Sequence, residues 1–260
     1  MSLLVDSHCH INFDPLGGQL PAVFDHAKAN GVGHMLCVSV NLEDYPQVQA
    51  LAHAHANVFA SAGVHPNERD GRDPSAAELV ALAQDARVVA VGETGLDYFR
   101  CSGDMGWQQQ RFREHIRAAR TVRKPLIIHT REAARDTLRI LKEEGAHEVG
   151  GVMHCFTEDW DTAQQALAMN FYISFSGIVT FRNAAALRAV AVQVPAERLL
   201  IETDAPYLAP RPYRGKTNEP AYVRHVAECL AELRGTPFAV IAEQTTRNFF
   251  TLFTHAQPIQ

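Results

Sequence analysis

The sequence lacks the features of disulfide-rich secreted proteins and of membrane proteins. Its 260 residues include five cysteines, an odd number without a C-x-x-C pair, which argues against a disulfide framework and favours a reducing compartment. No apolar run approaches the roughly 20 residues that a membrane span needs. The N-terminus has no basic patch followed by an apolar stretch, so we expect no signal peptide. We therefore expect a cytoplasmic protein without membrane contact.

An excess of positive charge is also missing. The chain has 24 Lys and Arg against 29 Asp and Glu, a formal net charge of -5, which argues against a protein that coats nucleic acid. A local basic rim would still suit a phosphate-bearing substrate. No internal repeat, low-complexity tract or charge run divides the chain. We predict a single domain over residues 1–260 and infer no obligate protein partner.

The sequence does contain eight short apolar runs, rich in Val, Ile and Leu and bounded by Gly and Pro, which are typical of buried strands. They begin at residues 3, 33, 58, 88, 125, 150, 171 and 199. Segments with helical spacing separate them, at residues 20–30, 43–56, 75–84, 108–123, 131–144, 160–169 and 183–192, and two more follow at 219–233 and 237–253. One helix start carries a capping-box pattern, Ser75 with Glu78 three residues later.

This alternation predicts an α/β fold, a (β/α)8 TIM barrel with an extra C-terminal helix. An open doubly wound sheet is the alternative.

Histidines and carboxylates follow the ends of these runs, where the active site of a (β/α)8 barrel lies. They are His8, His10, His65, Glu93, His129, His154, Glu202 and Asp204. Side chains alternate along a strand, so His8 and His10 share one face while Cys9 points away. The same alternation predicts that Cys155, beside His154, is a small buried apolar residue.

A second His-x-His, His53 and His55, falls in a predicted helix. A spacing of two residues turns these rings roughly 200° apart on a helix, so we do not expect them to bind one ion.

Burying several histidines and carboxylates at one end of a barrel is costly unless an ion compensates them. The candidate ligands are His8, His10, Glu93, His129, His154 and Asp204. A single catalytic zinc uses three protein ligands, so six candidates favour two divalent ions with a bridging carboxylate. Glu93, near the middle of the set, is the candidate bridge. Mixed nitrogen and oxygen donors suit Zn, Mn or Mg and do not choose among them.

Blocks of sequence along nearly the whole chain resemble the TatD family of metal-dependent deoxyribonucleases. The blocks are DSHCHINF, GVHPNE, VGETGLDYFR, KPLIIHTREA, HCFT, GIVTFRN, LLIETDAPYLAP and RGKTNEPAYV. The resemblance implies that His8, His10 and Asp204 hold one ion, that His129 and His154 hold a second, and that Glu93 bridges them. It also implies a phosphodiester-cleaving hydrolase, of the kind that acts as a 3'-to-5' exonuclease on single-stranded DNA or RNA.

For this chemistry we expect Glu93 and Asp204 to be catalytic, with Asp204 as the candidate proton acceptor. His65 has no place among the six ligands, and we expect it to bind the substrate phosphate or to pass a proton. Arg131, two residues past His129, is the strongest candidate for a phosphate contact.

A basic rim is expected around the same mouth, because further cations follow predicted strand ends. They are Arg100, Arg182, Arg211, Arg214 and Lys216. Arg214 is a candidate for substrate binding, and Tyr98 is a candidate for stacking on a base.

Two other functions stay open. The same centre could hydrolyse an ester, a lactone or an amide. The protein could instead store metal or bind nucleic acid without turnover, although a full ligand set with a candidate general base argues against that.

Overall fold

Eight parallel strands form the centre of the protein. The computed structural model describes residues 4–99, 101 and 103–258. The strands are β1 Leu4–Cys9, β2 Val32–Cys37, β3 Val58–Ala62, β4 Val88–Asp97, β5 Leu126–Arg131, β6 Gly151–Met153, β7 Phe171–Phe175 and β8 Leu199–Ile201. Each pairs with the next in chain order.

The sheet closes where β1 meets the segment that follows β8. Cys9 and Ala205 form a bridge there. The His10 amide donates to the Ala205 carbonyl at 2.8 Å, and the Asp204 amide donates to the His8 carbonyl at 2.9 Å. The predicted (β/α)8 barrel is confirmed, and the open-sheet alternative is wrong.

Within the described residues, nine α-helices follow the predicted segments closely. They are α1 Leu20–Ala29, α2 Tyr45–Ala54, α3 Ala76–Ala83, α4 Gly106–Val122, α5 Ala134–Glu143, α6 Trp160–Ala168, α7 Ala185–Gln193, α8 Val223–Arg234 and α9 Phe238–Leu252. The predicted cap of α3 is confirmed, because the Ser75 hydroxyl accepts from the Glu78 amide at 3.2 Å. The segment predicted from residue 131 begins too early, since Arg131 still belongs to β5 and Glu132 has a φ of 53°, which no helix continues.

Side-chain alternation along the strands produces two cores. Outward residues such as Leu4, Met35 and Ile128 pack under the ring of helices. Inward residues such as Val5, Phe59 and Leu200 fill the amino-terminal part of the barrel. The amino-terminal part of the barrel interior is therefore a packed apolar floor.

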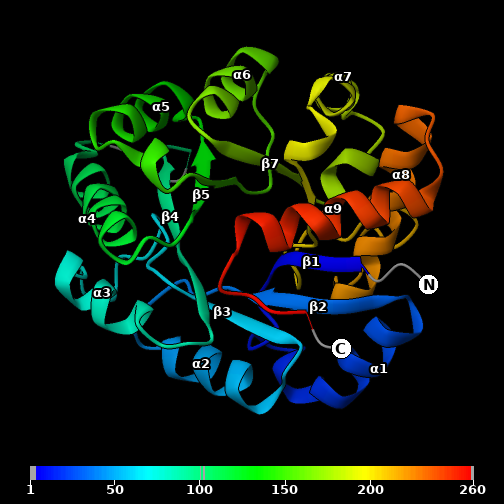
Figure 1. Cartoon of the computed structure of the whole chain (residues 1–260), viewed down its shortest axis with the longest axis horizontal. Coiled ribbons are helices and arrows are strands. Elements are labelled where there is room, and N and C mark those ends of the chain that lie inside the picture. Colours follow the sequence, from blue (N-terminus) through cyan, green and yellow to red (C-terminus); the bar gives the residue numbers. More distant parts are fainter. Residues whose placement is uncertain (1–3, 100, 102, 259–260) are drawn as a thin grey trace.

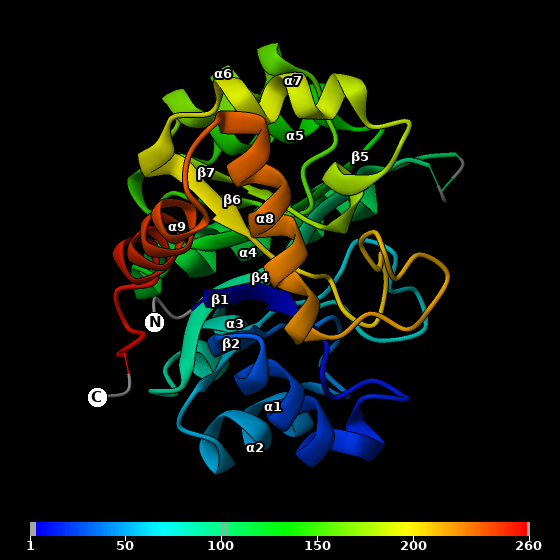
Figure 2. The ribbon, with the colours of Figure 1, turned by 90° about the vertical axis from the view of Figure 1, so that its right-hand side faces the viewer.

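Helix α9 closes the floor. Figure 1 shows it (red) lying across the middle of the ring formed by the other helices. Phe249 of this helix and Phe253 just after it belong to the inward core, and Asn248 Nδ2 donates to the Leu199 carbonyl at the start of β8 at 2.8 Å. In Figure 2 the loops that leave the carboxyl ends of the strands lie on the side opposite α9. One mouth is thus sealed, and the other is left for chemistry.

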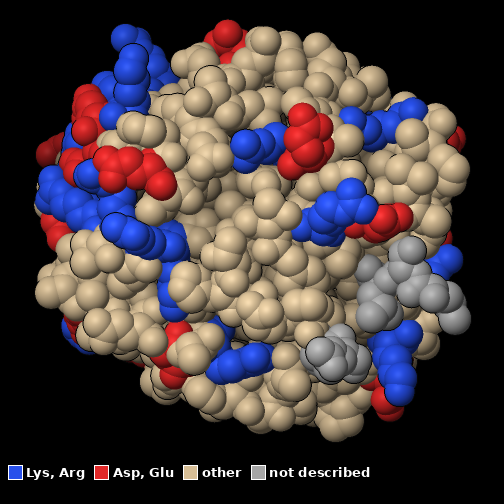
Figure 3. Space-filling model, in the orientation of Figure 1, with Lys and Arg blue, Asp and Glu red and all other residues tan. Residues whose placement is uncertain are grey.

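Charged residues on the flank of the barrel pair with each other. Between α4 and the segment after α5, Arg113 and Arg117 contact Glu144 at 2.8 and 3.0 Å. Figure 3 shows blue and red side chains interleaved over α4 and α5. These arginines are neutralised locally, so they add little to a field that would attract a polyanion. Among the described residues, no helix has the length and apolar character that crossing a membrane requires.

Replacing Phe249 by Ala should destabilise the packed floor of the barrel. The ring is fully buried against Phe59 and Phe253, so its loss should lower the free energy of unfolding by ~3–5 kcal/mol. Urea denaturation followed by circular dichroism measures this change. Val240→Ala, on the exposed side of the same helix, should change it by less than about 0.5 kcal/mol. Equal effects of the two variants would contradict the role given to α9.

Candidate metal centre

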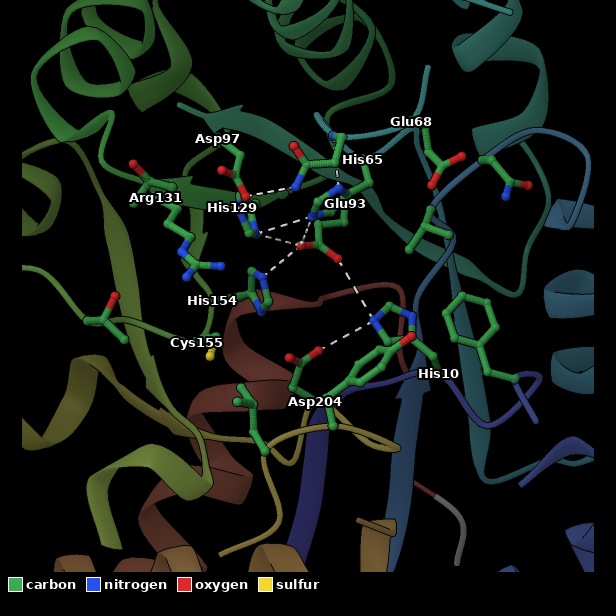
Figure 4. A pocket seen from close by; sticks show the side chains of 18 of the residues that line it. His10, His65, Glu68, Glu93, Asp97, His129, Arg131, His154, Cys155 and Asp204 are labelled. Carbon is green, nitrogen blue, oxygen red and sulfur yellow. Dashed lines mark hydrogen bonds and ion pairs between the residues drawn. The ribbon is translucent and has the colours of Figure 1, made fainter. Parts of the chain in front are cut away.

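Seven donor side chains converge at the carboxyl ends of the strands. Figure 4 shows Glu93 with His10, His65, His129, His154 and Asp204 around it. The donors are His8 in β1, His10 just past it, His65 after β3, Glu93 in β4, His129 in β5, His154 after β6 and Asp204 after β8. The structure thus brings together all six predicted ligands and adds His65 to them.

Two glycines in β4 let Glu93 and His129 approach each other. Gly92 and Gly95 have φ values of 145° and 137°, which residues other than glycine rarely adopt. A Cβ atom at Gly95 would lie 2.0 Å from the His129 carbonyl oxygen, and one at Gly92 would lie 2.7 Å from that of Ile127. Only glycine permits β4 and β5 to lie this close, and this proximity brings the Glu93 carboxylate against the imidazole of His129.

The first group of donors consists of His8, His10 and Asp204. His8 Nε2 lies 3.2 Å from His10 Nε2. Asp204 Oδ1 lies 3.7 Å from the former nitrogen and 3.4 Å from the latter. Glu93 Oε2 lies 3.3 Å from His8 Nε2. Four donor atoms therefore surround one point.

The second group gathers at the other oxygen of Glu93. Its Oε1 lies 2.7 Å from His154 Nε2, 3.2 Å from His129 Nδ1 and 3.4 Å from His65 Nε2. Ligands of a tetrahedral zinc at ~2.1 Å stand roughly 3.4 Å apart, so both groups have the spacing of a coordination shell. Glu93 is the residue that belongs to both.

The outer ring nitrogens of two histidines fix where their lone pairs point. His10 Nδ1 lies 2.9 Å from the Val38 carbonyl, and His129 Nε2 lies 3.1 Å from Asp97 Oδ2. Both partners are acceptors, so these nitrogens carry the proton, and the inner nitrogens direct a lone pair towards the centre. Carboxylate and carbonyl partners of this kind orient metal-bound histidines in many proteins.

His154 is held in the same way, by Glu202. Its Nδ1 lies 3.1 Å from Glu202 Oε1, which also accepts from the Cys155 amide at 2.8 Å. The inner Nε2 then faces Glu93 Oε1, and among the described residues it has no hydrogen-bond partner despite the 2.7 Å contact. Two acceptors this close require a cation between them, either a proton or a metal ion.

His65 has the opposite polarity. The Asn67 amide donates to its Nδ1 at 3.0 Å, so in the neutral ring the proton sits on Nε2. Burial lowers the pKa of His65 to about 3, which keeps the ring neutral. Its inner nitrogen is therefore a hydrogen-bond donor, whereas the inner nitrogens of His10, His129 and His154 are hydrogen-bond acceptors.

The charges of the centre depend on each other. Burial raises the pKa of Glu93, but the imidazoles of His154, His65 and His8 outweigh burial and hold this pKa well below its usual range. Burial lowers the pKa of His154, but Glu93 and Glu202 raise it well above the usual value. An ionised carboxylate thus stands beside a ring that holds a proton, and a metal ion would have to displace this proton because a histidine ligand must be neutral.

Helix α4 fixes the turn that carries His65. Three polar side chains on one face, Gln108, Arg111 and His115, are buried there. His115 Nε2 accepts from the Val64 amide at 2.9 Å, and Arg111 Nη1 donates to the His65 carbonyl at 2.9 Å.

Gln108 ties the same helix to β4. It accepts from the Asp97 amide at 3.0 Å, and its Nε2 donates to the carbonyls of Asp97 and Pro66 at 3.1 Å each. Through Asp97 and the His65 turn, α4 acts on both His129 and His65.

The centre lies in a cavity of about 840 Å³. Arg131 is the only Lys or Arg among the described residues of its lining, and Figure 4 shows it beside His129 and His154. Its guanidinium carbon lies 3.7 Å from the centre of the Phe99 ring. Carboxylates line the wall as well, namely Asp44 and Glu68.

The sequence matches a known protein family along nearly its whole length. The sequence model described as TatD related DNase matches residues 5–254. The chain belongs to the TatD family.

Its relatives in this family cover almost the whole chain. The uncharacterized metal-dependent hydrolase YcfH of Escherichia coli K12 is 49% identical over 254 residues, which are 96% of this chain and 95% of that protein. The 3'-5' ssDNA/RNA exonuclease TatD of Klebsiella pneumoniae is 35% identical over 237 residues, 89% of this chain and 90% of that one. The crystal structure of YjjV, a TatD homologue of Escherichia coli, matches with a TM-score of 0.88 at 31% identity and covers 96% of this chain and 98% of that one. Family and donor set together identify a metal-dependent hydrolase.

Two residues predicted to bind substrate lie elsewhere in this TatD-family structure. Tyr98 follows Asp97, so alternation turns it outwards, where its hydroxyl donates to Asp136 at 2.9 Å and accepts from Gln109 at 2.9 Å. Arg214 lies over the Phe181 ring, 3.7 Å from its centre. Neither is part of the cavity lining.

The wider basic rim is not found at the cavity either. Arg182, Arg211 and Lys216 are absent from its lining, as judged from the described residues, and Arg100 lies outside these residues. Cys155 corrects a further expectation, because it lines the cavity with its Sγ 3.1 Å from Ser176 Oγ. Its φ of 42° breaks the strand alternation on which that expectation depended.

The second His-x-His is structural, as predicted. His53 lies on α2 and contacts Asp85 at 2.9 Å. His55 follows that helix and packs on Phe24, with 4.4 Å between the ring centres.

Sequence reasoning left Asp97 and Glu202 out of the site. The available signal for Glu202 was its spacing, since Glu202 precedes Asp204 by two residues, as His8 precedes His10.

Gln108→Ala should destabilise the protein far more than Gln110→Ala. Gln108 is fully buried and makes hydrogen bonds with Asp97 and Pro66, whereas Gln110 is exposed on the same helix and contacts only Glu114 among the described residues. Unsatisfied buried groups should lower the free energy of unfolding by ~2–3 kcal/mol. Urea denaturation of both variants measures the difference. A similar, small loss in both would refute the role given to α4.

Proposed function

We propose that this chain is a 3'-to-5' exonuclease that cleaves phosphodiesters of single-stranded DNA or RNA at two divalent ions bridged by Glu93. The observation that carries the proposal is that the two oxygens of Glu93 face two separate groups of nitrogen donors. Two adjacent divalent ions are a common arrangement in nucleases and phosphatases. The exonuclease relative, at 35% identity, supports the same reaction.

The proposed ligands divide between the two positions. His8, His10 and Asp204 would hold one ion, and His129 and His154 the other. Mixed imidazole and carboxylate donors suit Zn or Mn, and Mg less well because it prefers oxygen. His65 is left out of both sets, because its inner nitrogen is a donor.

Bound divalent ions supply Lewis-acid polarisation of a phosphoryl oxygen and favour ionisation of water. Around them, Arg131 provides a guanidinium fork for a non-bridging phosphate oxygen. His65 Nε2–H faces the same region, and a neutral donor can bind a phosphate oxygen without moving its own proton.

Asp204 is the proposed proton acceptor. Its side chain is 16% exposed, against 1% for His8 and 4% for His10, so it alone in the first group faces incoming water. Burial raises the pKa of Asp204, but His10, His8 and His154 lower it below the usual value. The carboxylate is therefore ionised at neutral pH, which is the form in which a carboxylate can accept a proton.

Hydrolysis of an uncharged ester, lactone or amide is the second candidate. The acidic wall formed by Asp44 and Glu68 favours it, because these carboxylates repel a polyanion, and Arg131 is the single opposing cation in the described lining.

The exonuclease proposal predicts stepwise shortening of a 5'-labelled single-stranded oligonucleotide. Protein stripped with EDTA should be inactive, and refilling with Mn, Zn or Mg should restore a ladder that grows from the 3' end. Gel electrophoresis of time points measures it, with a 3'-phosphorylated oligonucleotide as the comparison for end recognition. If no ion restores cleavage while ester or lactone substrates are hydrolysed, the second candidate replaces the first.

Glu93→Ala should remove metal from both positions, because each group loses a shared ligand. The metal content of the purified protein, measured by mass spectrometry, should fall from about two ions per chain to fewer than one. Activity should fall at least about a thousandfold. Glu68→Ala, a carboxylate of the same cavity outside both donor groups, should keep both ions. Full metal content in Glu93→Ala would disprove the bridge.

A further inference from the structure

Tyr207 is a large exposed aromatic residue at the wall of the cavity. It is 56% exposed and yet belongs to the lining, three residues after the candidate ligand Asp204. An exposed ring beside a functional cavity is a common mark of a binding surface. Tyr207 is neither a candidate metal ligand nor a proposed phosphate contact.

The backbone under this ring is held rigidly. The Tyr207 amide donates to the Asp204 carbonyl at 2.9 Å. Asn218, which is fully buried, donates from Nδ2 to the carbonyls of Tyr207 and Thr203 at 2.6 and 2.9 Å, and its own amide donates to the Pro206 carbonyl at 3.0 Å. The segment around residue 218 therefore clamps the loop that carries Asp204. The backbone that carries the ring is therefore held in place relative to Asp204, and the ring itself is exposed.

A second aromatic residue lines the same cavity. Phe13 stacks on the His10 ring, with 5.0 Å between centres and 13° between planes. Leu208 and Ile178 add apolar lining. Figure 4 shows His10 and Asp204 below Glu93, His65 above it and Arg131 to its left. Phe13 stacks on His10, and Tyr207 follows Asp204 by three residues, so both aromatic residues belong to segments that carry the first group of donors.

We propose that Tyr207 and Phe13 form an aromatic subsite that stacks on the nucleobase next to the scissile phosphate. The inference rests on the proposed exonuclease function and adds the part of the substrate that is recognised. Every base has a π-face, so such a subsite accepts all sequences and still requires a base. It also explains how a cavity with a single Arg in its described lining holds a nucleic-acid end, since stacking needs no cation.

The test removes the ring and the base separately and together. Two oligonucleotides of equal length are compared, one ending in a normal 3' nucleotide and one ending in an abasic 3' nucleotide. Wild-type protein should cleave the abasic end with a kcat/KM lower by about tenfold. Tyr207→Ala should lose about tenfold on the normal end and show little further loss on the abasic end.

Two variants separate stacking from a disturbance of the loop. Tyr207→Phe keeps a ring and should restore the preference for the base. Tyr213→Ala removes a tyrosine from the same segment that stacks on Tyr222 and does not line the cavity, and it should keep the wild-type preference. Metal content and thermal unfolding are measured for each variant, so that loss of Asp204 as a ligand is detected.

The outcomes distinguish the subsite from the reaction. If Tyr207→Ala keeps the wild-type preference for a base while wild-type protein yields a 3' ladder, the subsite is wrong and the exonuclease stands. If wild-type protein shortens neither oligonucleotide with any metal, the exonuclease proposal fails and the subsite falls with it. Loss of the preference in Tyr207→Ala at full metal content, with its return in Tyr207→Phe, supports both.

Discussion

A carboxylate buried among imidazoles is the interaction on which this site depends. Glu93 is almost completely enclosed, and burial alone would favour its neutral form. It stays ionised because His154, His65 and His8 surround it. Three of the histidines near it have their outer nitrogens held by acceptors, so their inner lone pairs face the carboxylate. Acceptors pointing at acceptors form an arrangement that only a cation stabilises.

The barrel and the centre are built from the same contacts. The sheet closes through backbone bonds of His8, His10 and Asp204, which are the donors of the first group. Asp6 reinforces this seam, because its carboxylate accepts from the amide and hydroxyl of Thr203 at 2.9 and 2.5 Å. Burial raises the pKa of Asp6 to about 8, against the lowering effect of these bonds. The contacts that close the barrel therefore also hold the candidate ligands His8, His10 and Asp204 in place.

Periodicity explains why much of this could be predicted from the sequence. The eight apolar runs locate the strands, and alternation puts His8 and His10 on one face. Alternation fails where the backbone leaves the strand, as at Cys155, and applied past the end of β4 it would have turned Tyr98 outwards. The cations expected at the rim are not among the described lining residues apart from Arg131, since the position of a cation after a strand says nothing about which way its loop folds. The polarity of His65 depends on the Asn67 amide, a tertiary contact that no local pattern encodes.

Electrostatics and size together restrict what can enter the cavity. The net charge of -5 acts over long range, and physiological salt screens it beyond ~8 Å. Within the cavity screening is weak, so the acidic wall of Asp44 and Glu68 opposes phosphate while Arg131 and the metal centre attract it. The cavity volume of about 840 Å³ lies within the range of small-molecule and cofactor sites. The proposed substrate would present one phosphate to the centre and a flat apolar ring to Tyr207, and it would therefore bring little charge past the acidic wall.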